Sequence, residues 1–149
     1  MNGLILIVED DKTLAGLFAQ SLRAASFDVE IVHTMAEADA RVDREPKLAC
    51  IVLDQYLPNG LGVEMLDGFE NRHPSTHIPI IALTGADVSP AAVYKAGMQA
   101  LLIKPVSVKN LVDTVSDVVS NFVSNKMHEP MIRSVKELRA ELARALASA

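Results

Sequence analysis

The chain has 149 residues, 50% of them hydrophobic and 22% charged, with a net charge of −5 and one cysteine. This composition supports a buried core and excludes a disordered chain, a disulfide scaffold and a multi-cysteine metal site. Its acidity argues against direct binding of nucleic acid. No apolar run reaches the roughly 18 residues of a membrane span and no secretory signal is present, so we expect a cytoplasmic protein without membrane insertion.

Five short apolar segments in the first 126 residues predict β-strands. Four are continuous apolar runs, as expected for parallel strands that helices cover on both faces. They lie at 4–8, 51–53, 78–83 and 100–103. The fifth, at 29–32, is more polar and is expected nearer a sheet edge.

Helical segments separate these strands. The first helix has an apolar face made of Leu14, Leu17, Phe18 and Leu22. The second begins with capping-box spacing from Thr34 to Glu37, the third follows Gly62, and the fourth begins at Ser89-Pro90. Ser107 can cap a fifth helix at 108–124. Strands alternating with helices predict an α/β fold around a five-stranded parallel sheet.

The C-terminal part differs from the rest. We divide the chain into a domain at 1–126 and a linker with an amphipathic helix at 127–149, because Pro130 interrupts any helix arriving from upstream. The helix itself is expected over 131–148, with apolar residues at Ile132, Val135, Leu138, Leu142 and Leu146. A helix of about 18 residues is marginal alone in water, so it needs a surface or a second copy to pack against.

Polar residues follow the strands at their carboxyl ends, where open α/β sheets place their sites. The second strand contributes only His33 and Thr34, whereas the other four end in Glu9-Asp10-Asp11, Asp54, Thr84-Gly85 and Lys104-Pro105. Taken singly, each has an ordinary interpretation, such as Asp11 capping the first helix. Carboxylates that converge repel one another unless a cation neutralises them, and an all-oxygen set suits Mg²⁺.

The same residues argue against neighbouring classes of protein. Nucleotide and flavin binders of this architecture need a Gly-rich or hydroxyl-rich first turn to hold phosphate, and the acidic turn after the first strand would repel it. Phosphatases that use a strand-end aspartate need a second aspartate two residues later, where this chain has Tyr56.

Taken together, these motifs resemble the receiver domain of two-component response regulators over about residues 3–125. The resemblance is carried by Val8-Glu9-Asp10, by Asp54 followed by Leu57-Pro58 and Gly62, by Leu83-Thr84-Gly85 and by Lys104-Pro105. It implies a flavodoxin-like doubly wound fold with strand order 2-1-3-4-5. It also implies a cis Lys104–Pro105 bond and a histidine kinase or histidine phosphotransfer protein as partner.

The resemblance also implies a role for each site residue. Asp54 would accept the phosphoryl group, and Mg²⁺ would be held by Glu9, Asp10, Asp54 and the backbone carbonyl of Tyr56. Thr84 and Lys104 would contact the phosphoryl oxygens. The chain would not be an enzyme with a separate substrate, because it would catalyse only its own phosphoryl transfer and dephosphorylation.

Two features leave alternatives open. The family usually has Tyr or Phe three residues before the lysine, where this chain has Leu101, so a receiver-like interaction module with incidental phosphorylation is the alternative function. The chain could also be a segment of a longer regulator or hybrid kinase. The fifth helix carries a wide apolar stripe, which either packs on its own sheet or joins the C-terminal helix in a homodimer: Val108, Leu111, Val112, Val115, Val118, Val119, Phe122 and Val123.

Overall fold

The computed structural model describes residues 3–45, 47–54, 56–57, 60–61, 78–84 and 99–125, with side chains omitted at 56, 57, 60, 61 and 122–125. The expected third and fourth helices and the helix at 131–148 lie outside these residues. The division of the chain near residue 126 therefore stays a prediction.

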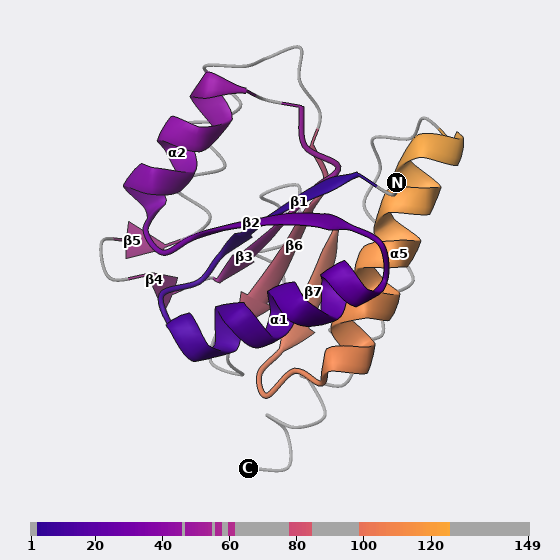
Figure 1. Ribbon diagram of the computed structural model, residues 1–149, viewed down its shortest axis with the longest axis horizontal. Helices are drawn as coiled ribbons and strands as arrows, with labels where there is room; N and C mark the ends of the chain where they lie inside the picture. The colour runs from indigo at the N-terminus through magenta and orange to yellow at the C-terminus, as the bar shows by residue number, and fades with distance from the viewer. Residues whose placement is uncertain are drawn as a thin grey trace, which may run out of the picture.

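Five parallel strands form the central sheet, in the order β2-β1-β3-β6-β7 (Figure 1). Their bounds are β1 Leu4–Val8, β2 Asp28–Val32, β3 Cys50–Asp54, β6 Ile80–Thr84 and β7 Ala100–Ile103. The expected strands and their order are confirmed, with β2 at an edge. A two-stranded antiparallel pair that the sequence did not predict, β4 (Tyr56–Leu57) and β5 (Gly60–Leu61), follows β3.

Three helices are described, and each begins where the sequence supplies a cap. They are α1 Lys12–Ala24, α2 Met35–Arg44 and α5 Val108–Asn125. In each case the side chain of the capping residue accepts a hydrogen bond from the backbone N–H three residues later. The bonds are Leu14 to Asp11 at 3.0 Å, Glu37 to Thr34 at 3.1 Å and Asn110 to Ser107 at 3.0 Å. Each cap satisfies a backbone donor that the first turn of a helix leaves without an intrahelical partner. The expected caps at Asp11, Thr34 and Ser107 are therefore confirmed, and the one at Ser89 lies outside the described residues.

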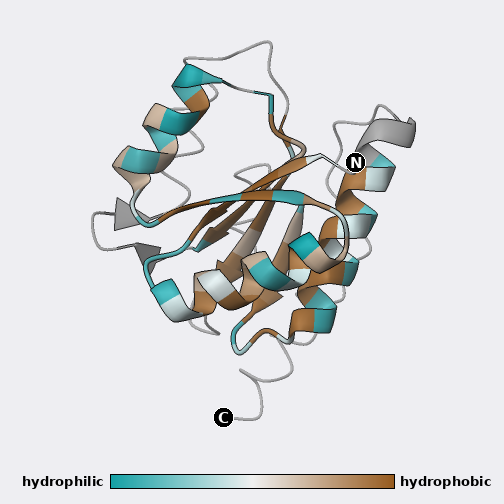
Figure 2. Cartoon of the chain, in the orientation of Figure 1, coloured by the Kyte–Doolittle hydropathy of each residue, from teal (hydrophilic) through white to brown (hydrophobic). Residues whose placement is uncertain are grey.

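The two faces of the sheet form two cores. α1 and α5 lie side by side over one face, and we call the cluster beneath them the α1/α5 core (Figure 1). α2 packs on the opposite face, and we call the cluster between α2 and the sheet the α2 core; it includes Ala38 and Val42 of the helix. In Figure 2 the strands between the helices are largely hydrophobic, and the hydrophilic residues lie on the outer sides of the helices. Because side chains alternate along a strand, each strand contributes to both cores.

The structure corrects the expected apolar face of α1. Leu17 does not point to the core but is 47% exposed, and Leu14 is only partly buried. Phe18 and Leu22 are buried as expected, and Ala15 and Ala19 complete the buried face. Small alanines let the helix backbone approach the sheet closely, a role that a count of large apolar residues overlooks.

On α5, the described part of the apolar stripe packs on its own domain. Leu111, Val115 and Val118 are fully buried in the α1/α5 core, and Val112 and Val119 pack against that core. The side chains of Phe122 and Val123 lie outside the described set. These contacts favour the interpretation that the stripe mainly covers the sheet.

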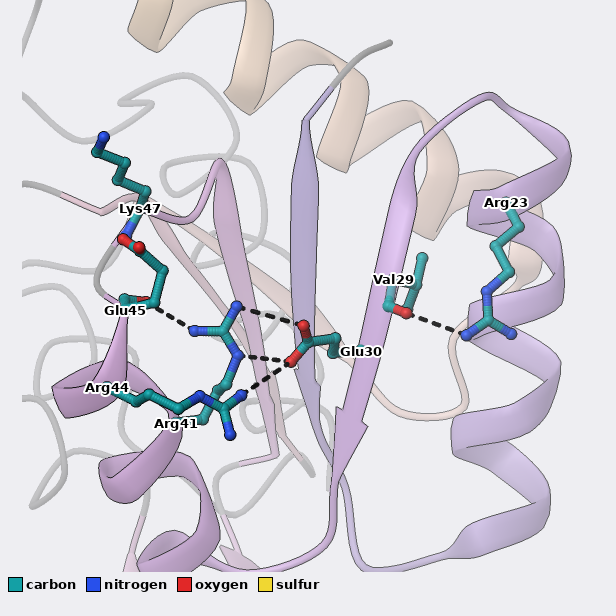
Figure 3. A network of polar contacts seen from close by, with 7 residues as sticks. All are labelled: Arg23, Val29, Glu30, Arg41, Arg44, Glu45 and Lys47. Carbon is teal, nitrogen blue, oxygen red and sulfur yellow. Dashed lines mark hydrogen bonds and ion pairs between the residues drawn. The ribbon is translucent and has the colours of Figure 1, made fainter.

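A polar network fastens α2 to the edge strand β2 (Figure 3). Arg41 of α2 is only 7% exposed and donates to both carboxylate oxygens of Glu30, through Nε at 2.5 Å and a terminal nitrogen at 3.3 Å. It also donates to the Glu45 carbonyl at 2.7 Å. Arg44 reaches the same carboxylate at 4.0 Å. The fork of Arg41 and the carboxylate of Glu30 match in the bidentate geometry that arginine favours.

Candidate functional site

The strand register brings the predicted site residues to one edge of the sheet. Val8 of β1 pairs with Leu53 of β3, so the residues that follow them, Glu9 and Asp54, lie at the same level. Farther along the sheet, Thr84 of β6 pairs with Ile103 of β7, the residue before Lys104. The expected convergence of strand ends is therefore observed for these four positions.

The alternation of side chains explains which of these groups meet. In β1, β3 and β7, the residues two positions before Glu9, Asp54 and Lys104 all belong to the α1/α5 core. The three site residues continue that alternation on the same side of the sheet. Thr84 comes two residues after Ala82 of the α2 core, which places it on the other side. The side chains of Glu9, Asp54 and Lys104 are thus directed toward one another by the strands that carry them.

Lys104 lies between two buried carboxylates. Its Nζ is 3.3 Å from Glu9 Oε1 and 3.3 Å from Asp54 Oδ1. Glu9 is fully buried and Asp54 is 3% exposed, whereas the lysine side chain is 34% exposed. Burial by itself would lower the pKa of Lys104, but the charges of Asp54 and Glu9 outweigh it and raise that pKa. The ammonium and the two carboxylates therefore favour one another's charged forms.

Glu9 holds its negative charge poorly. Burial, followed by hydrogen bonding to and repulsion from Asp54, raises the pKa of Glu9 to about 8, and the charge of Lys104 offsets only part of this increase. One lysine is therefore not enough to neutralise the site. Among the described residues, Glu9 Oε2 has no hydrogen-bond partner although it is buried. A buried oxygen without a partner is costly unless another group, such as a cation, satisfies it.

The carboxylates fit a divalent metal ion. Glu9, Asp10 and Asp54 each offer an oxygen, and these atoms lie within 4.8 Å of one another. Asp10 is exposed, so the cluster is open to water on one side. Mg²⁺ prefers oxygen ligands and usually keeps several waters, which a cluster of two buried carboxylates and one exposed carboxylate allows. The predicted ligand carboxylates are therefore brought together, and the partnerless Glu9 oxygen agrees with such an ion.

Two other predicted residues lie close by. Thr84 is buried at the end of β6, and its carbonyl accepts a hydrogen bond from the Lys104 N–H at 2.7 Å. Lys104–Pro105 is a cis peptide bond, as expected. Tyr56 lies in β4, two residues after Asp54, with its side chain outside the described set. Its predicted carbonyl ligand stays a prediction.

One nearby residue was missed by the sequence reasoning. His33, which offered no partner in the sequence, bonds through Nδ1 to the Glu9 carbonyl at 2.9 Å. Its position directly after β2, level with Glu9 after β1, was the available signal. Leu101, which replaces the aromatic expected from the resemblance, is buried in the α2 core and pairs with Ala82.

Within the residues that the structure describes, no helix has the length and apolar character needed to cross a bilayer.

Comparison with known proteins agrees with this geometry. The response regulator receiver domain model matches residues 5–116. The response regulator protein PilR of Pseudomonas aeruginosa is 30% identical over 111 residues, which is 74% of this chain and 25% of PilR. Across the first curated relatives, the chain spans between 25% and 60% of their length.

Solved structures give the same result. A CheY-like receiver domain protein from Methanospirillum hungatei is 26% identical with a TM-score of 0.74, and the match covers 82% of this chain and 97% of that one. The beryllofluoride-activated NtrC4 receiver domain dimer is 25% identical with a TM-score of 0.72, covering 82% of this chain and 99% of that one. The receiver domain model matches most of this chain, and the sheet brings carboxylates and a lysine together at one edge. This chain therefore belongs to the response regulator receiver domain family.

Proposed function

We propose that the chain is the phosphoacceptor of a two-component system and takes a phosphoryl group from a histidine kinase or a histidine phosphotransfer protein. Asp54 is the acceptor. The observation that carries this proposal is its placement, 3% exposed at the carboxyl end of the central strand, beside Lys104 and within the carboxylate cluster. A kinase partner of this kind also supports a cytoplasmic location.

The proposed reaction is a nucleophilic displacement at phosphorus. An Asp54 carboxylate oxygen forms the new O–P bond, the P–N bond of the donor's phosphohistidine breaks, and the imidazole leaves and regains its proton from solvent. Phosphoryl transfer depends mainly on positioning and charge stabilisation. Mg²⁺, held by Glu9, Asp10, Asp54 and the Tyr56 carbonyl, supplies positive charge to the phosphoryl oxygens when it is bound.

The remaining roles belong to Lys104 and Thr84. The Lys104 ammonium, now 3.3 Å from Asp54, is placed to pair with a phosphoryl oxygen once Asp54 is modified. Thr84 ends the strand next to that of Asp54, and its hydroxyl would have to reach across this end of the sheet, from the other face, to contact another phosphoryl oxygen. The chain would act on itself only, because the acceptor carboxylate belongs to the protein, and so it would not be an enzyme with a separate substrate.

Acetyl phosphate with Mg²⁺ tests the acceptor directly. We expect intact-mass spectrometry to show a gain of one phosphoryl group that hydroxylamine removes, as it does from acyl phosphates. The gain should disappear in Asp54→Asn and when Mg²⁺ is chelated, but persist in Asp11→Asn. Asp11 is a neighbouring aspartate that caps α1 and is absent from the carboxylate cluster.

A phosphoryl gain that survives in Asp54→Asn would contradict the assignment of the acceptor. No gain in the wild-type chain would instead favour the interaction module, for which phosphorylation is incidental. The present geometry favours the phosphoacceptor, because binding a protein partner gives no reason to bury two carboxylates beside one lysine.

The second part of the proposal is a homodimer formed by α5 and residues 131–148. Similarity to the NtrC4 receiver domain dimer supports it, as does the apolar stripe that the C-terminal segment cannot bury alone. Because the described α5 valines pack on their own core, the C-terminal stripe must supply most of the contact.

Sedimentation of the full chain tests the dimer. We expect a dimer at tens of micromolar that Leu138→Glu with Leu142→Glu converts to a monomer, with beryllofluoride changing the dimer's dissociation constant. A wild-type chain that is monomeric with and without beryllofluoride would contradict this part of the proposal and leave the phosphoacceptor assignment intact.

A further inference from the structure

We infer that His33 is a positioning residue for the carboxylate site, holding the Glu9–Asp10 peptide in the orientation that metal binding needs. The inference deepens the proposed function and rests on it. It begins from one contact, the 2.9 Å hydrogen bond between His33 Nδ1 and the Glu9 carbonyl.

The pairing of β1 with β2 continues one step beyond the strands. Val8 pairs with Val32, and the Glu9 N–H then donates to the Val32 carbonyl at 3.1 Å. In a regular parallel ladder, the Glu9 carbonyl would next accept from the N–H of residue 34. The chain instead leaves β2 at Val32 and begins α2 with Thr34 as its cap.

The His33 imidazole supplies the hydrogen bond to the Glu9 carbonyl that the N–H of residue 34 would supply in a regular ladder. A carbonyl oxygen can only accept, so Nδ1 must carry the proton, which it does both in the Nδ1–H tautomer and in the imidazolium ion. The bond therefore does not depend on the charge of the ring. His33 is partly buried, so the bond is also partly shielded from competition by water.

This contact controls more than one group. The Glu9 carbonyl and the Asp10 N–H belong to one rigid peptide plane, so the bond orients the backbone at the start of Asp10 as well. Glu9 and Asp10 are two of the three carboxylates that lie within 4.8 Å of one another. Without His33, the peptide could rotate, and two of the three ligands would lose their fixed placement.

The chain offers a matched control. Arg23 of α1 donates to the Val29 carbonyl of β2 at 3.0 Å, which is likewise a partly buried bond from a side chain to a backbone carbonyl (Figure 3). Val29 pairs with Ile5, near the opposite end of β1 from Glu9. Arg23→Ala therefore removes a similar bond without touching the site.

Mg²⁺ titration of the full chain, followed by amide NMR, tests the role. We expect His33→Ala to weaken Mg²⁺ binding on the order of fivefold, as loss of one neutral hydrogen bond predicts. His33→Asn should restore most of the affinity, because its amide N–H can reach the same carbonyl, and Arg23→Ala should bind as the wild type does. In the metal-free protein, the Asp10 amide resonance should move in His33→Ala and not in Arg23→Ala.

A measurement on the unmodified chain keeps the test independent of variant folding. The imidazole ¹⁵N shifts of metal-free wild-type protein should show Nδ1 protonated when the ring is neutral. A neutral ring protonated at Nε2 alone, or His33→Ala binding Mg²⁺ with wild-type affinity, would overturn the inference. A wild-type chain that binds no Mg²⁺ would contradict the proposed function instead, and the tautomer measurement would still decide whether His33 holds the peptide.

Discussion

Lys104 and the carboxylates beside it form a site that is incompletely neutralised. The lysine neutralises part of the charge of Glu9 and Asp54 at 3.3 Å, while Glu9 Oε2 has no hydrogen-bond partner among the described residues. A metal ion and Lys104 are therefore two cations acting on the same carboxylates. Removal of one increases the negative potential that the other experiences.

Replacing Lys104 should consequently spare metal binding. We expect Lys104→Met to bind Mg²⁺ at least as tightly as the wild type, because it removes a cation and no ligand. Amide shift changes on adding beryllofluoride should nevertheless shrink, since the ammonium can no longer pair with the analogue. Loss of Mg²⁺ binding in Lys104→Met would contradict the roles assigned here, and Lys109→Met, on the exposed surface of α5, is the control.

Among the individual residues, the sequence predicted the site residues that follow strands and missed the contact of His33 with the backbone. Glu9, Asp54, Thr84 and Lys104 could be predicted because apolar runs locate strand ends, and parallel strands bring those ends together. The position of His33 after a strand could be predicted as well, but its contact with Glu9 could not, because its partner is a carbonyl rather than a side chain. A hydrogen bond to a backbone group leaves no complementary residue type for a sequence pattern to detect.

Among the elements, α1 shows how helical periodicity can locate the edge of an apolar face incorrectly. The leucines at 14 and 17 suggested a stripe, but the sheet contacts a face with two alanines and Phe18. The predicted and observed faces share Phe18 and Leu22, and the observed face is turned slightly about the helix axis, away from Leu17 and toward Ala15 and Ala19. Periodicity therefore predicts that a helix is amphipathic more securely than which residues it buries.

Paired substitutions on α1 should separate the two faces. We expect Phe18→Ala to reduce the free energy of unfolding by about 3–5 kcal/mol, because it opens a cavity in the α1/α5 core. Leu17→Ala, at a site that is 47% exposed, should change it by no more than about 0.5 kcal/mol. Urea denaturation of the two variants measures both values, and a larger loss for Leu17→Ala would contradict the observed orientation.

The contact between α2 and β2 should make stability depend on acidic pH. Hydrogen bonding from Arg41 lowers the pKa of Glu30 below its usual 4.5. The contribution of the ionised Glu30 to the free energy of unfolding is therefore complete above pH 4.5 and is lost as the pH falls below 4.5. Because Glu30 is 42% exposed, we expect Glu30→Gln to cost less than about 1 kcal/mol at neutral pH.

Denaturation across pH measures this contribution. The difference between wild type and Glu30→Gln should shrink as the pH falls below 4.5. Arg41→Met should be more destabilising than Arg44→Met, since Arg44 is 72% exposed and lies 4.0 Å from the carboxylate. Equal losses for the two arginine variants would show that the bidentate contact and the bond to the Glu45 carbonyl contribute little.

Over the whole molecule, the parallel sheet was the feature most readily predicted. β1 and β7 have the expected bounds, and the other strands differ from expectation by two residues at most, because buried parallel strands are short apolar runs. Less could be predicted where polar residues are buried. Arg41 and Gln99 are of residue types usually found at the surface, yet both are buried. The Gln99 side chain accepts a hydrogen bond from the Ile80 N–H at 2.9 Å.

The connection between β1 and α1 is short, and each of its residues has a separate role. β1 ends at Val8 and α1 begins at Lys12, so the connection consists of three acidic residues that do three different things. Glu9 is buried at the site, Asp10 is exposed beside it and Asp11 caps the helix. A deletion of one residue here would move each carboxylate into its neighbour's place, and an insertion would separate the cap from the ligands. This connection should therefore tolerate substitutions such as Asp11→Ser far better than any change in its length.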